Sequence, residues 1–239
     1  MRLLSCFICL FLLTGCHTEI NDVPVYDSNT FTFLEEDFYI PTNTHDLIPL
    51  DLSSSSILID EPGNYILSGH YQDTSITINL IERGNVRLIL NNLEATANQT
   101  PFLSVVTPTK VTISQLEDTN NSLRSDQTVI ETNGPITFNG QGNLSITSPT
   151  TTLSSKKVIS FCGGNYHFVS GKHGLVSDEI IAIHSGNINI NSQNNGLYIH
   201  NENGLVYMLD GNLTITSTDL PISNEGNTNI VGGVQTFKK

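Results

Sequence analysis

The chain is poor in basic residues, in charge of either sign and in tryptophan. Of its 239 residues, 10 are Lys or Arg against 23 Asp or Glu, which gives a formal net charge of -13, and none is Trp. A protein that binds nucleic acid needs a basic stripe to replace the counterions on phosphate, so this class is excluded. Only 14% of the residues are charged, where ordinary globular chains have about 25%. Asn, Thr, Ser and Ile take their place, and this mixture is typical of a β-rich protein rather than a helical one.

Cysteine is scarce as well. The chain has 4 Cys residues, of which Cys6 and Cys9 lie in an N-terminal apolar run and Cys16 ends that run. Removal of the run with lipidation of Cys16 would leave Cys162 as the last free thiol. An intramolecular disulfide and a cysteine-based zinc site are therefore excluded from the mature protein.

The N-terminus has the pattern of a secretory signal. Arg2 precedes a mainly apolar run over residues 3–13, and the letters L-T-G-C close it at Cys16. The run is too short to cross the roughly 30 Å of bilayer hydrocarbon as a helix. Its last four letters resemble a bacterial lipobox, so we expect residues 1–15 to be a lipoprotein signal peptide and Cys16 to carry several acyl chains. The alternative is a plain signal peptide that is cut nearby, with Cys16 incidental.

Residues 16–52 show no clear period. They contain three prolines and scattered aromatic residues such as Phe31 and Phe38. The prolines fit a tether that holds a domain away from the membrane, whereas the aromatic residues favour packing on the domain as an N-terminal cap. Both interpretations stay open, and the folded domain is predicted over residues 53–239.

The C-terminal half of the chain repeats itself. Gly-Asn occurs at 142–143, 164–165, 186–187 and 211–212, and Gly-Val follows at 233–234, in steps of 22, 22, 25 and 22 residues. Residues that recur at one fixed spacing stack above one another, whereas the hairpins of a sandwich would alternate in direction about every 8–12 residues. The sequence therefore predicts an all-β fold, a right-handed parallel β-helix (solenoid) with about 22 residues and three short strands per coil.

The repeat also predicts columns of equivalent side chains. Because neighbouring coils lie about 4.8 Å apart, apolar columns would form a continuous core. The two predicted core columns are Leu144, Tyr166, Ile188 and Leu213, and Ile146, Phe168, Ile190 and Ile215. A third column consists of the amides that follow the corner glycines, which we interpret as a structural ladder rather than as ligand-binding groups. Its members are Asn143, Asn165, Asn187 and Asn212.

The first half of the domain fits the same architecture less regularly. Short strands are predicted between turn signals such as Pro-Gly at 62–63 and Asn-Asn at 91–92. The longer polar stretch 115–132, which contains Asn121, is expected to bulge out of the coils as a loop. Terminal coils are expected to be atypical because they cover a hydrophobic end.

Three stretches resemble a known family. They are PGNYILSG at 62–69, VRLILNNL at 86–93, and C-terminal coils in which Gly-Leu is followed by Ser-Gly-Asn-Ile-Asn-Ile. Over roughly residues 56 to 236 the chain resembles the bacterial secreted carbohydrate-binding β-helix family, which is related in fold to pectate lyases. The resemblance implies binding of an acidic plant polysaccharide such as polygalacturonate, with calcium, and no established enzymatic activity.

The chain departs from that family where calcium is implied to bind. The family's coils carry Asp-Asp-Gly-Ile, and the matching pairs here are Thr150-Thr151, Lys172-His173, Asn194-Asn195 and Asp219-Leu220. Calcium takes about 6–8 oxygens and is usually held by several carboxylates. Of the matching pairs here, only Asp219-Leu220 keeps a carboxylate, so these corners have lost most of the family's calcium ligands. One calcium ion held by Asp178 and Asp219 is the remaining cofactor hypothesis.

The register of the repeat predicts a binding edge. It places Lys172, Asn194 and Asp219 in one column, and Asp178, His200 and Glu225 in another. Amides supply both donors and acceptors for sugar hydroxyls, and a tyrosine in the same coils is available for stacking. The candidate carbohydrate-binding residues are Lys172, Asn194, Asn195, Tyr198, His200 and Glu225.

The sequence thus predicts a lipid-anchored protein of a bacterial cell envelope, at the outer membrane or the cell surface, that binds polysaccharide or glycan without catalysis. One alternative is an adhesin-like structural solenoid with protein partners, and another is a polysaccharide lyase or hydrolase. Catalysis is disfavoured because neighbouring strand residues such as Asp178 and Glu179 face opposite sides and cannot act as a carboxylate pair. The net charge of -13 also opposes a polyanionic ligand unless a cation mediates.

Overall fold

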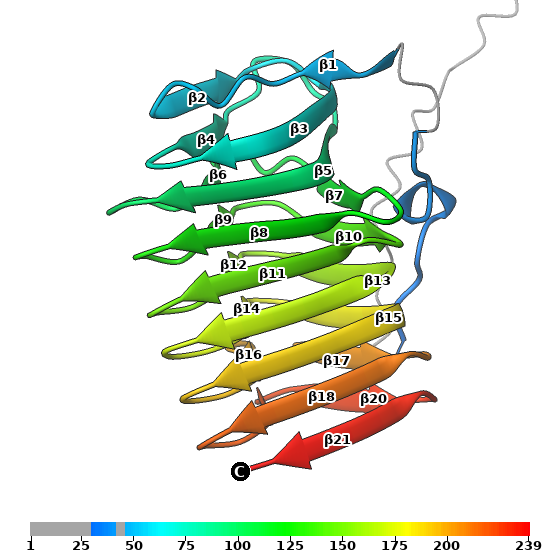
Figure 1. Ribbon diagram of the computed structural model, residues 1–239. Helices are drawn as coiled ribbons and strands as arrows, with labels where there is room; N and C mark the ends of the chain where they lie inside the picture. Colours follow the sequence, from blue (N-terminus) through cyan, green and yellow to red (C-terminus); the bar gives the residue numbers. More distant parts are fainter. Residues whose placement is uncertain (1–29, 42–45) are drawn as a thin grey trace, which may run out of the picture.

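The computed structural model describes residues 30–41 and 46–239. Parallel strands stack into a solenoid of about 8 turns, with equivalent residues about 23 apart (Figure 1). This confirms the predicted parallel β-helix. Helix in the described part is confined to short 3-10 stretches such as η1 (Glu35–Asp37), and none of them is long and apolar enough to span a membrane.

Each coil has three faces. The first and second faces belong to a 13-stranded sheet that bends at a corner, and the third face is a separate 8-stranded sheet. Four strands continue through the corner: β3 (Gly63–Tyr71), β5 (Val86–Ala97), β13 (Val158–Ser170) and β15 (Ile180–Ser192). The first face also contains β1 (Ile48–Pro49), β7 (Val111–Gln115), β10 (Ile136–Gly140), β17 (Leu205–Met208) and β20 (Asn227–Ile230). The second face also contains β8 (Asn120–Ser125), β11 (Asn143–Ser148), β18 (Asn212–Ser217) and β21 (Val234–Lys238). The third face consists of β2 (Ser56–Ile59), β4 (Ser75–Ile78), β6 (Leu103–Val105), β9 (Ile130–Thr132), β12 (Leu153–Ser155), β14 (Leu175–Ser177), β16 (Leu197–Ile199) and β19 (Ile222–Asn224).

The corner between the first and second faces is turned at the glycines of the repeat. Gly186 has a φ of +114°, a conformation that L-residues with a side chain rarely adopt. A Cβ at this position would lie 2.9 Å from the carbonyl oxygen of Gly164 in the preceding coil. Gly164 and Gly211, the glycines of two other Gly-Asn pairs, also have positive φ, whereas in the coil of Asn143 the positive φ is at Gly140.

The predicted core columns lie inside the solenoid. Leu144 pairs with Tyr166, and Tyr166 pairs with Ile188 in the next coil. Ile190 lies between Phe168 and Ile215 and is 0% exposed. Because successive residues of a strand face opposite sides, the alternation that places these side chains inward places their neighbours on the surface.

The expectation of a loop over residues 115–132 is wrong. The strands β8 and β9 lie within this stretch and pair in register with the neighbouring coils. Asn121 occupies the core column at the level of Leu144 and is buried. Its side-chain oxygen accepts a hydrogen bond from the Leu93 amide at 2.9 Å, and its nitrogen donates to the Asn143 carbonyl at 3.1 Å. A polar residue in a core position thus hid the repeat from the hydrophobic pattern.

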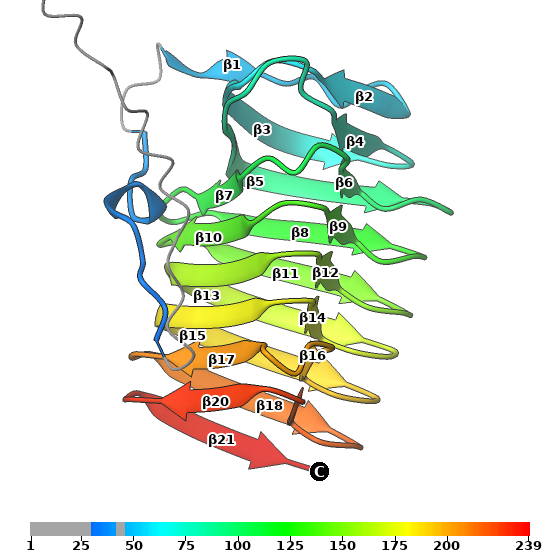
Figure 2. The same ribbon diagram turned by 180° about the vertical axis from the view of Figure 1, so that it is seen from behind.

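Residues 30–41, which we name the strap, lie along the outside of the first face (Figures 1 and 2). Phe31 and Phe33 pack on an apolar patch of outward-facing side chains. The ring of His184 contacts Phe33 and Phe38, with ring centroids 5.1 Å and 4.7 Å away. The patch consists of Val158, Ile180, Ala182, Leu205 and Tyr207.

A buried carboxylate fixes the strap next to this patch. Asp37 is 3% exposed, and its carboxylate lies 2.6 Å from the Lys110 ammonium. The Thr137 hydroxyl donates to the same carboxylate, and the Asn139 amide donates to the Asp37 carbonyl at 2.8 Å. The strap therefore covers this part of the first face.

Burial raises the pKa of the nearby Cys162 thiol, and the charge of Asp37 raises it further, so the thiol stays protonated.

The chain joins the solenoid soon after the strap. β1 pairs with β3, and Leu52 is buried in the core of the first coils. The predicted signal peptide, the predicted lipidation site Cys16 and the part of the predicted tether before residue 30 lie outside the described residues.

Candidate functional site

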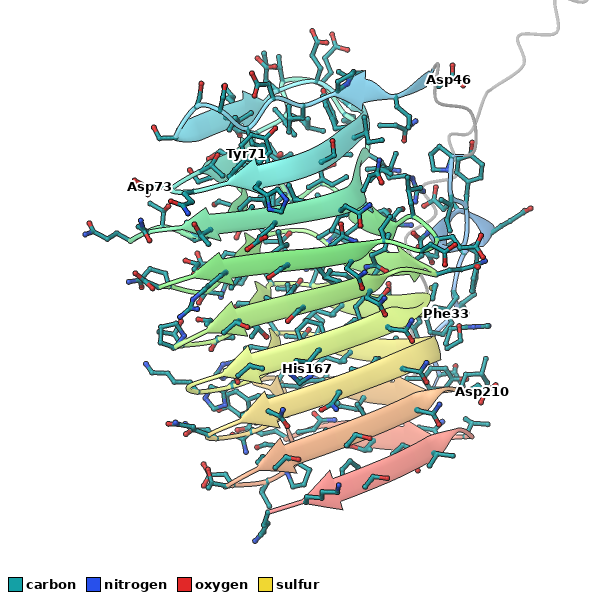
Figure 3. All side chains as sticks on the ribbon, in the orientation of Figure 1. Phe33, Asp46, Tyr71, Asp73, His167 and Asp210 are labelled. Atoms are coloured by element: carbon teal, nitrogen blue, oxygen red, sulfur yellow. The ribbon has the colours of Figure 1, made fainter. Side chains whose placement is uncertain are left out.

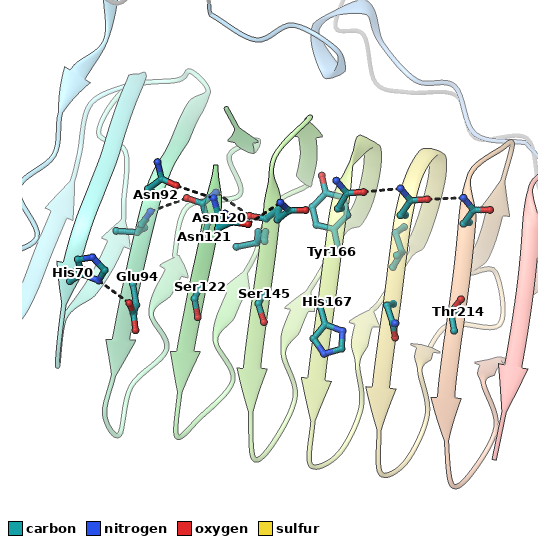
Figure 4. A pocket seen from close by; sticks show the side chains of 18 residues that line it. His70, Asn92, Glu94, Asn120, Asn121, Ser122, Ser145, Tyr166, His167 and Thr214 are labelled. Carbon is teal, nitrogen blue, oxygen red and sulfur yellow. Dashed lines mark hydrogen bonds and ion pairs between the residues drawn. The ribbon is translucent and has the colours of Figure 1, made fainter. Parts of the chain in front are cut away.

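A groove of about 880 Å³ runs along the second face from β3 to β18 (Figure 4). Two rows of outward-facing side chains line it, and both follow the solenoid axis. We name as the amide row Asn92, Asn120, Asn143, Asn165, Asn187 and Asn212. We name as the central row His70, Glu94, Ser122, Ser145, His167, Asn189 and Thr214. Figure 3 shows His167 on this face.

The in-register pairing of parallel strands creates both rows. Asn165 pairs with Asn187, and two residues further His167 pairs with Asn189. Residues two apart in a strand face the same side, so each coil adds one side chain to each row. With coils about 4.8 Å apart, the six amides span about 24 Å.

The amide row is a hydrogen-bonded ladder, as the sequence predicted. The side-chain nitrogen of Asn187 donates to the side-chain oxygen of Asn165 at 2.7 Å, and Asn212 donates to Asn187 at 2.6 Å. Asn143 donates in the same way to Asn120 at 3.0 Å. A primary amide has two N–H donors and two acceptor sites, so the ladder leaves one donor and one acceptor of Asn187 for a ligand. The amide row therefore has two roles: its hydrogen bonds join neighbouring coils, and its side chains line the groove.

The groove is almost uncharged. Among the described residues that line it, Glu94 is the single carboxylate and none is Lys or Arg. The Glu94 carboxylate lies 2.8 Å from Nδ1 of His70, near one end of the groove. Hydroxyl, amide and imidazole groups of the central row face the open side, so the groove offers neutral hydrogen-bond donors and acceptors along its length.

The predicted binding residues gather elsewhere, at the turns beside the third face. Lys172 and Asn194 lie one coil apart, and the backbone N–H of Asn194 donates to the Lys172 carbonyl at 2.9 Å. Asn195 is buried, and its side-chain nitrogen donates to the Leu220 carbonyl at 3.2 Å, which is a structural contact. Glu225 is exposed in the last coil. The coils thus pair in the register that the repeat predicts. None of these side chains is among the lining residues of the groove on the second face.

The aromatic side chains of that edge stack on one another. The ring of Tyr198 lies parallel to that of His173 with centroids 4.7 Å apart, and His200 approaches it edge-on at 4.3 Å. His173 and Tyr198 belong to neighbouring coils, and Tyr198 pairs in register with Val176. Burial lowers the pKa of His173, and the neighbouring His200 lowers it further, so the imidazole is neutral near pH 7. One face of Tyr198 is thereby covered by a ring of the protein.

The predicted calcium ligands do not form a set that fits the ion. Asp178 follows the carboxyl end of β14 and lies 3.1 Å from the Lys156 ammonium, whereas Asp219 precedes the amino end of β19, two strands away in the same sheet. In the described ranges, 30–41 and 46–239, no three His, Cys, Asp or Glu side chains gather closely enough to hold a metal ion. Calcium takes about 6–8 oxygens, of which Asp178 and Asp219 would supply only a part.

The sequence interpretation missed the central row. Its signal is the polar residue two places after each asparagine of the repeat, such as Ser145, His167 and Asn189. The alternation of the strands predicts which residues face inward, but it does not distinguish outward residues that line a groove from outward residues on a flat surface. That the second face is hollowed is a tertiary feature that no residue type marks.

The geometry defines a parallel β-helix protein with a long polar groove on one face. Residues 53–239 match the description "Carbohydrate-binding domain-containing protein", and the chain belongs to that family. Among solved structures it is similar to a polysaccharide lyase-like protein from C. thermocellum, with a TM-score of 0.63 and 20% identity over 80% of this chain and 92% of that one. At this identity the likeness shows the fold alone. No curated protein matches the sequence.

Proposed function

We propose that the chain binds an extended carbohydrate in the groove of the second face and performs no chemistry on it. The observation that carries the proposal is the amide row, which places an asparagine side chain on the groove at each coil from Asn92 to Asn212. Membership of the carbohydrate-binding family supports it. A ligand that satisfies such a surface is itself a repeating polymer rich in hydroxyl groups, which both donate and accept hydrogen bonds.

The absence of catalysis is supported by the charges in the groove. Hydrolysis of a glycosidic bond normally needs two carboxyl groups about 5–9.5 Å apart on either side of the bond. Among the described lining residues, Glu94 is the single carboxylate, and its partner is His70. The groove therefore fits a binding role better than that of a hydrolase. A lyase needs a cation to stabilise its anionic intermediate, and the described lining residues include no Lys or Arg.

A triple substitution in the central row tests the location of the site. Ser145, His167 and Asn189 make no side-chain hydrogen bond within the described part of the chain, so Ser145→Ala/His167→Ala/Asn189→Ala should leave the thermal melt nearly unchanged. Each lost polar contact with a ligand is worth about 0.5–1.5 kcal/mol. We expect titration calorimetry to show affinity for a bound glycan reduced by at least about tenfold.

The matched control is the edge predicted from the sequence. Asp178→Ala/Asn194→Ala/Asp219→Ala removes the same number of polar groups beside the third face. This variant should retain the affinity of the unaltered protein. The opposite pattern, loss at the edge and retention in the groove, would move the site to the edge.

We propose in addition that lipid on Cys16 holds the protein at the surface of a bacterial cell envelope. The support is the L-T-G-C sequence at the end of the apolar run. Several acyl chains together make a stable anchor, whereas a single chain binds marginally. Cys16→Ser should therefore move the protein from the detergent phase to the aqueous phase in a detergent-partition assay. Retention of the variant in the detergent phase would refute the anchor.

A further inference from the structure

We infer that the groove is selective for a linear, uncharged polysaccharide and binds it without calcium. The inference deepens the proposed function and rests on it, because it names the class of ligand that the same groove accepts. It departs from the calcium-dependent binding of acidic polysaccharide that the family resemblance implies. The charges and the spacing of the groove carry it.

The charge of the groove opposes a polyuronate. A polyuronate has a carboxylate on each sugar, and a site for it needs Arg, Lys or a metal ion at regular intervals. The described lining residues include none of these cations, and Glu94 places a carboxylate within the groove. The chain as a whole has a formal net charge of -13. An acidic chain would therefore meet like charge along the groove with no fixed positive charge to pair with it.

This lining supplies few of the charged oxygens that a calcium bridge would need. The amide and hydroxyl oxygens of the amide and central rows are neutral, and Glu94 already lies 2.8 Å from His70. Calcium sites in proteins are built from several oxygens that include carboxylates. Asp178, which the sequence pattern suggests as a calcium ligand, is not among the lining residues of the groove and pairs instead with Lys156 beside the third face.

The spacing of the groove favours a linear chain along the solenoid axis. The asparagine side chains of the amide row repeat about every 4.8 Å, which is close to the length of one sugar residue in an extended chain. Ser122, Ser145 and Thr214 repeat hydroxyl groups beside them in the central row. Neutral hydroxyls of successive sugars can therefore meet an amide in one row and a hydroxyl or amide in the other.

A binding panel on the full-length protein in detergent tests the inference. The probes are linear β-1,4-glucan, β-1,4-mannan, β-1,4-galactan and β-1,4-xylan oligosaccharides, together with polygalacturonate, each with calcium and with a chelator. We expect at least one neutral probe to bind with the same affinity in both conditions. Its binding should also be insensitive to salt, because no ion pair is involved. The central-row variant Ser145→Ala/His167→Ala/Asn189→Ala should weaken this binding by at least about tenfold.

The outcomes separate the inference from the proposed function. Binding of polygalacturonate alone, and only with calcium, would overturn the inference and leave carbohydrate binding intact. Neutral binding that disappears with the chelator would overturn the calcium-independent part. Binding of no probe in either condition would overturn the inference and the proposed function together.

Discussion

Ile190→Asp should unfold most of the solenoid at room temperature. Ile190 is 0% exposed and lies between Phe168 and Ile215 in a continuous core column. An unpaired carboxylate at this position loses its hydration without gaining a partner, which costs at least several kcal/mol. Domains of this kind are stable by about 5–15 kcal/mol in total. Because each coil packs on its neighbours, the loss removes the support of the coils on both sides.

The neighbouring position gives the matched control. Asn189 lies next to Ile190 in β15 but faces the groove, and its side chain is exposed. Asn189→Asp introduces the same carboxylate into water, so we expect its thermal melt within a few degrees of the unaltered protein. Equal melts for the two variants, measured by circular dichroism, would show that the assignment of faces is wrong.

Lys110→Ala should release the strap without unfolding the coils. Lys110 is the cation that lies 2.6 Å from the carboxylate of Asp37, which is 3% exposed. Breaking a buried ion pair by removing one partner typically costs about 3–5 kcal/mol. The strap is a peripheral segment, so it can avoid this cost by detaching locally while the solenoid stays folded. Hydrogen exchange should then accelerate at the strap amides, such as that of Phe38, which donates to the Glu35 carbonyl.

Two further variants separate the ion pair from a general effect of charge. Lys172→Ala removes an exposed lysine and should leave exchange in the strap unchanged. Asp37→Asn combined with Lys110→Met removes both charges and should restore part of the protection, because no charge is then left buried alone. Unaltered exchange of the strap in Lys110→Ala would contradict the role assigned to the pair.

Part of the core could not be predicted because polar residues occupy it. Asn121 occupies the core position that Leu144 has in the next coil. Its buried amide is hydrogen-bonded to the backbone of Leu93 and of Asn143. Such a residue fits only because neighbouring coils supply its partners. A pattern of apolar residues indicates burial but does not reveal a polar group that is buried and hydrogen-bonded, so it predicts a loop where the structure has β8.

The sequence alone determined the parallel β-helix, the corner glycines and the inward columns around Ile190. These features depend on local periodicity, since a repeat of fixed length stacks equivalent residues whatever else surrounds them. The tertiary structure alone decided that the outward rows from His70 to Thr214 share one groove and that the strap covers the first face. The groove depends on how side chains from successive coils lie together, and the position of the strap depends on contacts such as Asp37 with Lys110, which are far apart in the sequence. Neither leaves a periodic signal in the chain, so both required the folded molecule.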